Sequence, residues 1–77
     1  MPTRHDPRFT EEANAAIAEL LPNASDVGKF CMGIVAGLAH SEGLQPDRRL
    51  LYNASVCSGP LGADVVFEAW LRERKTA

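Results

Sequence analysis

The residues of this 77-residue chain that could take part in chemistry are two cysteines, Cys31 and Cys57, and two histidines, His5 and His40. A structural zinc site needs several cysteines or histidines close together, and neither cysteine has a second one at the usual ligand spacing. Catalysis by a histidine would need a carboxylate or a serine that the spacing does not provide. We therefore predict no metal ion, no cofactor and no enzymatic activity.

The two cysteines fall on positions expected to face a core. A nucleophilic role for Cys31 would need an exposed thiol with a base beside it, and its place among apolar residues argues against that. Free buried cysteines and a disulfide between Cys31 and Cys57 are both compatible with the pattern. In the chain-entropy model, closing this loop would stabilise the fold by roughly 3.5 kcal/mol, a large share of the net stability of so small a domain.

The elements that must position these residues are helices. Hydrophobic periodicity predicts an all-α fold, a compact bundle of three to four short helices, and no strand-type alternation competes with it. Residues 1–9 contain two prolines and no apolar period, so we expect a mobile arm there and a single helical domain over residues 10–77. Thr10 should cap the first helix, and Pro22 should end it.

Capping signals define the remaining helices. Ser25 should cap a second helix, and Gly43 should end it in the left-handed conformation. Asp47 lies at the expected start of a third helix, and Pro60 lies at that of a fourth. The apolar positions expected to face the core are Ala13, Ala16, Ile17, Leu20 and Leu21 in the first helix; Val27, Phe30, Cys31, Ile34, Val35 and Leu38 in the second; Leu50, Leu51, Ala54 and Cys57 in the third; and Leu61, Val65, Val66, Ala69 and Trp70 in the fourth.

Small residues form a shallow face on the second helix, beside its large apolar stripe. Gly33, Ala36 and Gly37 would let another helix approach closely. We expect this face to pack internally, against the first or the fourth helix. The alternative is a seam between two copies of the chain.

Composition and charge exclude some classes of partner. The net charge is −2, with eight basic and ten acidic residues, so no electrostatic field favours nucleic acid. The longest strongly apolar run, residues 30–39, is about half of the roughly 20 residues needed to span a bilayer, so we expect no membrane-spanning segment. The amino-terminal residues lack the apolar centre of a secretory signal, which favours the cytoplasm unless a signal peptide has been removed.

Two segments carry a resemblance to a known family. The first, Cys31–Gly37, reads CMGIVAG and has the form Cys-x-Gly-hydrophobic-hydrophobic-x-Gly. The second, Val56–Pro60, reads VCSGP and is followed by an amphipathic stretch over Leu61–Leu71. In these features the chain resembles the Tai-type immunity proteins of type VI secretion, small helical bacterial proteins that neutralise peptidoglycan amidase effectors.

The resemblance implies an inhibitor that works by binding, with a disulfide between Cys31 and Cys57, a homodimeric state, a periplasmic location and an amidase as partner. The cysteine and glycine pattern belongs to the scaffold, so expected exposure alone indicates the contact residues. These are His40, Ser41 and Glu42 at the end of the second helix and Asp47, Arg48 and Arg49 after it. The alternative function is a small cytosolic interaction or adaptor protein, phage-encoded, that dimerises through its small-residue face.

Overall fold

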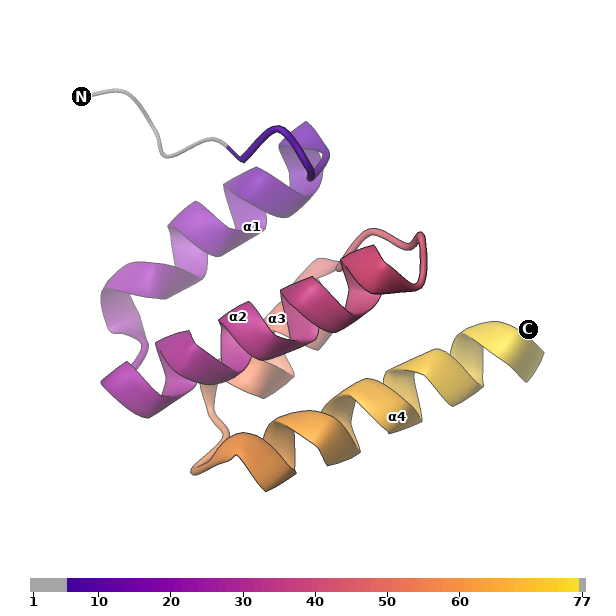
Figure 1. The fold of residues 1–77 in the computed structure, drawn as a ribbon. Coiled ribbons are helices and arrows are strands. Elements are labelled where there is room, and N and C mark those ends of the chain that lie inside the picture. The colour runs from indigo at the N-terminus through magenta and orange to yellow at the C-terminus, as the bar shows by residue number, and fades with distance from the viewer. Residues whose placement is uncertain (1–5, 77) are drawn as a thin grey trace.

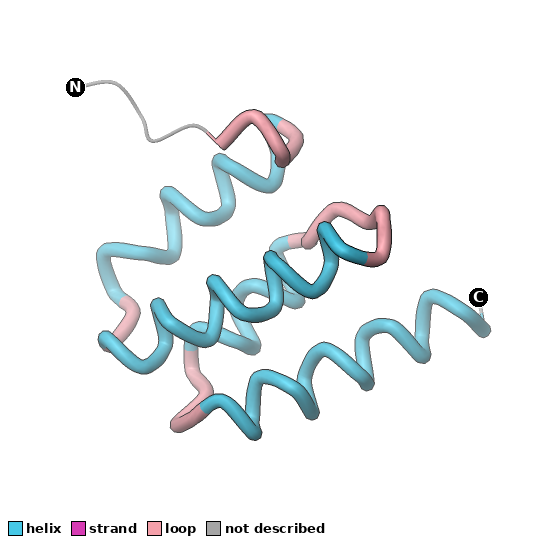
Figure 2. Tube along the Cα trace, in the orientation of Figure 1, coloured by secondary structure: helices cyan, strands magenta, loops and turns pink. Residues whose placement is uncertain are grey.

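The structure, a computed structural model, describes the backbone of residues 6–76 and the side chains of residues 6–74. This part of the chain forms four α-helices and one short 3-10 turn: α1 (Glu11–Leu20), η1 (Leu21–Asn23), α2 (Asp26–Ser41), α3 (Arg48–Ser55) and α4 (Pro60–Thr76). Successive helices run in opposite directions, so that α2 and α4 lie side by side and point the same way (Figure 1). Short loops join them, and residues 6–76 contain no strand (Figure 2). The predicted all-α bundle is confirmed.

Short polar side chains begin three of the helices. Thr10, Ser25 and Asp47 each accept the backbone N–H three residues ahead, at 3.1, 3.0 and 2.8 Å. These bonds satisfy N–H groups that have no partner within the helix. Gly43 follows α2 with a φ of 73°, the left-handed conformation that glycine adopts without strain. The predicted caps at Thr10 and Ser25 and the predicted stop at Gly43 are confirmed.

The short helix α3 lies at the centre of the fold and contacts each of the other three helices. Its side chains Leu50, Leu51 and Ala54 have no exposed surface, as the sequence predicts. An isolated helix of this length would not be stable in water, so α3 depends on the apolar area that its neighbours cover. Cys57, expected on the same face, lies beyond the end of the helix and is half-buried.

The helices α2 and α3 approach most closely where Gly28 faces the backbone of Ser55. A Cβ atom on Gly28 would lie 2.1 Å from the Ser55 carbonyl oxygen, so a larger residue cannot fit without a shift of backbone. Gly33 and Gly37 have no such neighbour, since a Cβ atom on either would meet nothing within 4 Å. The prediction that these two glycines serve packing inside the chain is therefore wrong, because the close contact of α2 lies at its first turn.

The segment before α1 is folded against the bundle from Asp6 onward. The buried side chain of Asn14 accepts the Asp6 N–H at 2.9 Å and donates to the Asp6 carbonyl at 3.0 Å. Phe9 is only 8% exposed and belongs to the core. The prediction of a mobile arm is therefore wrong for residues 6–9, because a polar side chain of α1 holds this backbone in place. Residues 1–5 lie outside the described part.

The helix α4 buries a different face from the predicted one. Its buried side chains are Ala63, Phe67 and Trp70. Of the predicted set, Trp70 is buried and Val66 is half-buried, whereas Leu61, Val65 and Ala69 are exposed. Both faces of α4 have helical spacing. The face with the two aromatic rings is the one that is buried, because its burial removes more apolar area from water.

The outer edge of α2 departs from the prediction in the same way. Cys31 and Val35 are buried as predicted, and Ile34 is half-buried. Val27 and Phe30, predicted to face the core, are exposed. The apolar stripe of α2 is wider than the surface that α3 and α4 can cover, so its edge remains in water.

The predicted disulfide is not present. Cys31 and Cys57 are free thiols and do not lie at bonding distance. The Cys31 thiol contacts the carbonyl of Gly59 at 3.4 Å, and the Cys57 thiol contacts the carbonyl of Asn53 at 3.2 Å. Cys57 therefore turns back onto the last turn of α3 instead of reaching across to α2.

Replacing Gly28 by alanine should destabilise the fold, because the added methyl group would overlap the Ser55 carbonyl oxygen. We expect a loss of about 1–3 kcal/mol in the free energy of unfolding, the range typical of overpacked sites. The matched control is Gly33→Ala in the same helix, where the methyl group enters open space. Higher helix propensity should then raise stability by up to about 1 kcal/mol. Urea denaturation followed by circular dichroism measures both, and equal stabilities would contradict the close crossing.

Candidate protein-binding surface

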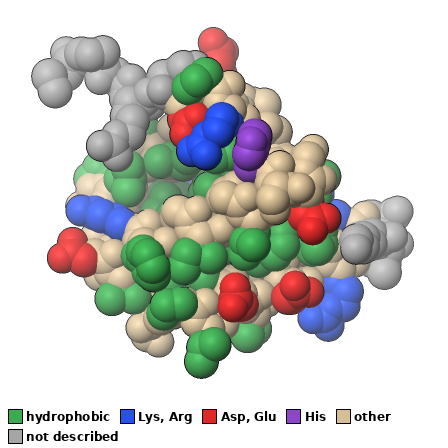
Figure 3. Space-filling view, viewed as in Figure 1, with side chains coloured by type: hydrophobic (Ala, Val, Ile, Leu, Met, Phe, Trp, Pro, Cys, Tyr) green, Lys and Arg blue, Asp and Glu red, His purple; other side chains and the backbone are tan. Residues whose placement is uncertain are grey.

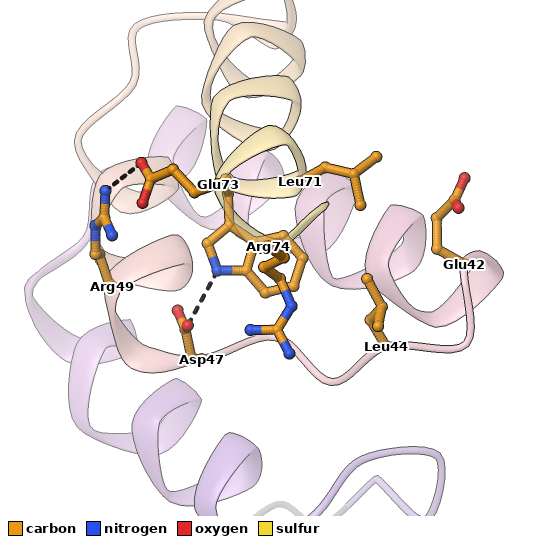
Figure 4. Close-up of a pocket in the computed structure, with 8 residues that line it drawn as sticks. Glu42, Leu44, Asp47, Arg49, Leu71, Glu73 and Arg74 are labelled. Atoms are coloured by element: carbon orange, nitrogen blue, oxygen red, sulfur yellow. Dashed lines mark hydrogen bonds and ion pairs between the residues drawn. The ribbon is translucent and has the colours of Figure 1, made fainter. Parts of the chain in front are cut away.

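Three of the six predicted contact residues line a hollow near the end of α4 (Figure 4). Glu42, Asp47 and Arg49 border this hollow, which has a volume of about 660 Å³. The ring of Trp70 forms part of its wall. The remaining lining residues are Leu44, Leu71, Glu73 and Arg74. The structure thus brings the end of α2, the start of α3 and the end of α4 to one place.

Polar side chains of this hollow bind one another. Asp47 caps α3 through Oδ1 and accepts the indole N–H of Trp70 through Oδ2 at 3.0 Å. Arg49 forms an ion pair with Glu73, and its hydrogen bond lowers the pKa of the Glu73 carboxyl. The guanidinium of Arg74 lies 4.7 Å from the centre of the Trp70 ring, within cation–π range. These contacts fix the end of α4 against α3, which gives Asp47 and Arg49 a structural role.

The other three predicted contact residues lie outside the hollow. His40 is exposed, and its ring meets that of Phe9 edge-on at a centroid distance of 6.1 Å. The hydroxyl of Ser41 donates to a backbone carbonyl of its own helix at 2.8 Å. Arg48 pairs with Glu19 of α1 at 2.7 Å and thereby lowers the pKa of the Glu19 carboxyl. Use of these residues by a partner stays a prediction.

The reactive groups do not converge. Cys31 has no exposed surface, and the pKa of the half-buried Cys57 thiol is raised, first by burial and then by the neighbouring Cys31. Among the described residues, no group of three His, Cys, Asp or Glu side chains could hold a metal ion. None of the helices in this part of the chain has the length and apolar character needed to cross a membrane.

Large apolar side chains in water mark a different surface. The described residues include six exposed large hydrophobics: Val27, Phe30, Tyr52, Val56, Leu61 and Val65. Four of the six belong to α2 and α4. Figure 3 shows hydrophobic side chains gathered over these two helices on one face of the molecule.

We define the apolar surface as the exposed residues Val27, Phe30, Leu61 and Val65 with the half-buried Ile34 and Leu38. Phe30 is 60% exposed, Leu61 82% and Val65 68%. Full burial of one such side chain contributes about 1.5–3 kcal/mol. Burial of several of them in an interface would therefore stabilise a complex substantially. Scattered apolar residues are ordinary on a protein surface, whereas a cluster on adjacent helices indicates an interaction site.

A second, smaller hollow lies between α1 and α2. It has a volume of about 300 Å³, and Gly33 and Gly37 contribute to its lining together with Ile17 of α1 and Leu21 of η1. Gly33 and Gly37 are thus open to solvent, whereas Ala36, the third residue of the small-residue face, is buried. Their alternative use, as a seam between two copies, stays a prediction.

The sequence analysis misses the apolar surface because it assigns the same residues to the core. Phe30, Leu61 and Val65 have the helical spacing of buried positions, and spacing alone does not tell which apolar stripe the chain itself covers. One signal was present: α4 carries two apolar stripes, more than one buried face requires.

Comparison of the chain with protein-family models, curated proteins and solved structures finds no match.

Replacing Asp47 by asparagine should lower the free energy of unfolding by about 1–2 kcal/mol. The single remaining side-chain oxygen can serve the cap of α3 or the Trp70 indole, but it cannot serve both. Asp64→Asn is the control for the lost charge, since Asp64 is exposed on α4 and should change stability by less than about 0.5 kcal/mol. Urea denaturation and the NMR signal of the indole N–H report the change. An unaltered indole signal together with unaltered stability in Asp47→Asn would contradict the two bonds.

The two thiols should both be free and protected in the folded protein. Cys31 is buried, and the raised pKa of Cys57 lowers its thiolate fraction at neutral pH. We expect slow reaction with Ellman's reagent in buffer and rapid release of two equivalents in urea without reductant. Protein carrying the disulfide would release none under either condition. The variant Cys57→Ser should leave one equivalent, which appears only on unfolding.

Proposed function

We propose that this protein is a binding protein that inhibits a partner enzyme by occupying it. The observation that carries the proposal is the apolar surface on α2 and α4, where Phe30, Leu61 and Val65 hold large side chains in water. Apolar residues at the centre of an interface supply much of the binding energy, and the protein needs no reactive group to act this way. Inhibition by occupation requires only that the surface be rigid, and two packed helices supply that.

The resemblance to Tai-type immunity proteins supports this function. Its two sequence segments lie in contact, since the Cys31 thiol meets the carbonyl of Gly59 in the second segment. The residues that carry the resemblance therefore belong to one structural unit, although no disulfide joins them. We propose a peptidoglycan amidase as the partner enzyme, and the periplasm as the place where the two meet.

The test uses the peptidoglycan amidase encoded nearest to the gene of this protein. Purified protein should inhibit its hydrolysis of peptidoglycan at equimolar concentration, and Val65→Glu should weaken inhibition at least tenfold by placing a charge in the interface. The matched control is Val56→Glu, since Val56 is 65% exposed but belongs to the end of α3, outside the apolar surface. Circular dichroism verifies that both variants fold.

The outcomes separate the possibilities. Inhibition by the wild type and by Val56→Glu, with loss in Val65→Glu, supports the proposal. Equal loss in both variants would place the effect outside the apolar surface. An amidase that stays fully active at tenfold molar excess of the protein contradicts the inhibitor function.

The exposure of Gly33 and Gly37 favours one second candidate, an adaptor that acts as a homodimer. Gly33 and Gly37 have open space above them, as a helix seam between two copies would require. Light scattering on wild type and Gly37→Leu distinguishes the two functions. A dimer in the wild type and a monomer in the variant would favour the adaptor, and a monomer in both would rule out this seam.

A further inference from the structure

The apolar surface has the shape of a strip suited to a helix. Phe30, Ile34 and Leu38 follow one another by one turn along α2, over a length of about 12 Å at 1.5 Å per residue. On the neighbouring α4, Leu61 and Val65 repeat the same spacing. The row on α2 matches the spacing by which an amphipathic helix presents its apolar face.

Free carboxylates lie on the α4 side of this strip. Asp64 and Glu68 are exposed, are one helical turn apart, and have no hydrogen bond or ion pair with another described residue. Figure 3 shows acidic side chains beside the hydrophobic ones on this face. Two further acidic residues, Asp26 and Glu42, stand at the first turn and the C-cap of α2. Helical spacing therefore places Asp64 and Glu68 between the apolar row on α2 and the outward-facing Leu61 and Val65 of α4. Acidic residues also lie at both ends of α2.

Positive charge is sparse at this strip. Lys29 of α2 belongs to the other flank of its helix, since it lines the hollow toward α1. Arg72 follows Glu68 by one turn and lies at the far end of α4, beyond Val65. An acidic partner, or an anionic membrane surface, would meet the carboxylates of Asp64 and Glu68 here. A second copy of the chain would bring the same carboxylates into the interface.

We propose that the apolar surface binds an amphipathic helix of a partner protein, with lysine or arginine on the flank of its apolar face that meets Asp64 and Glu68. Leucine-like side chains of that helix cover Phe30 and Ile34 on α2. Cations one turn apart pair with the two carboxylates and fix the register of the helix. The inference rests on the proposed binding function and adds the chemistry of the segment that is recognised.

The test uses two synthetic amphipathic peptides of 18 residues with the same leucine face. One carries lysine on both flanks of that face, and the other carries glutamate at the same positions. Both are titrated into the ¹⁵N-labelled full-length protein and followed by NMR. We expect the lysine peptide to shift the amide signals of α2 and α4, and to bind at least tenfold more tightly than the glutamate peptide.

A matched pair of variants locates the charge effect. Asp64→Asn with Glu68→Gln should reduce the preference for the lysine peptide at least fivefold. Glu11→Gln with Glu12→Gln is the control, because it removes two exposed carboxylates from α1, away from the strip. This control should keep the preference for the lysine peptide, because Glu11 and Glu12 lie away from the strip. The two double variants have equal net charge, so a difference between them reports the position of the carboxylates.

The peptide experiments test this inference independently of the amidase experiment. Selective binding that depends on Asp64 and Glu68 supports it. Equal affinity for both peptides, shifts confined to other helices, or no binding of either peptide overturns it, while amidase inhibition would still stand. Dimerisation of the chain that the lysine peptide does not disrupt would show that a second copy covers the strip, and would also overturn it.

Discussion

The burial of α3 is the constraint on which the rest of the structure depends. This helix of eight residues has Leu50, Leu51 and Ala54 wholly removed from water, and α1, α2 and α4 are arranged around it. Such a short helix is stable only when its neighbours surround it. The close approach at Gly28 lets α2 lie directly on the last turn of α3, and any larger residue there would require a shift of backbone. The centre of the fold therefore depends on a close approach of the α2 and α3 backbones and on the buried side chains of α3.

Covering α3 determines which faces of the longer helices remain outside. The core takes Val35 and its neighbours from α2, and Phe67 and Trp70 from α4. The bond from the Trp70 indole to Asp47 fixes the rotation of α4 about its axis, because the ring can reach that carboxylate only when its face points inward. Once this rotation is fixed, Leu61 and Val65 must point outward. The apolar surface is therefore a consequence of how the core is completed.

This arrangement relates stability to function. Asp47 and Arg49, expected to contact a partner, also hold α3 and α4 together. Residues expected to stabilise the core, above all Phe30, are instead exposed to solvent. Exposed apolar residues favour aggregation, and acidic side chains beside them with a net charge of −2 counteract it. The same carboxylates would select a partner of opposite charge.

The sequence by itself determined the helical fold, the caps at Thr10 and Ser25, the stop at Gly43 and the buried face of α3, because each depends on residues within one or two turns of one another. Only the tertiary structure decided which apolar stripe of α4 is buried, that Phe30 is exposed, that Gly28 makes the close contact, and that the two cysteines lie apart. It also decided that Asn14 holds the segment before α1. These outcomes depend on the rotation and separation of helices distant in sequence, which local spacing does not encode.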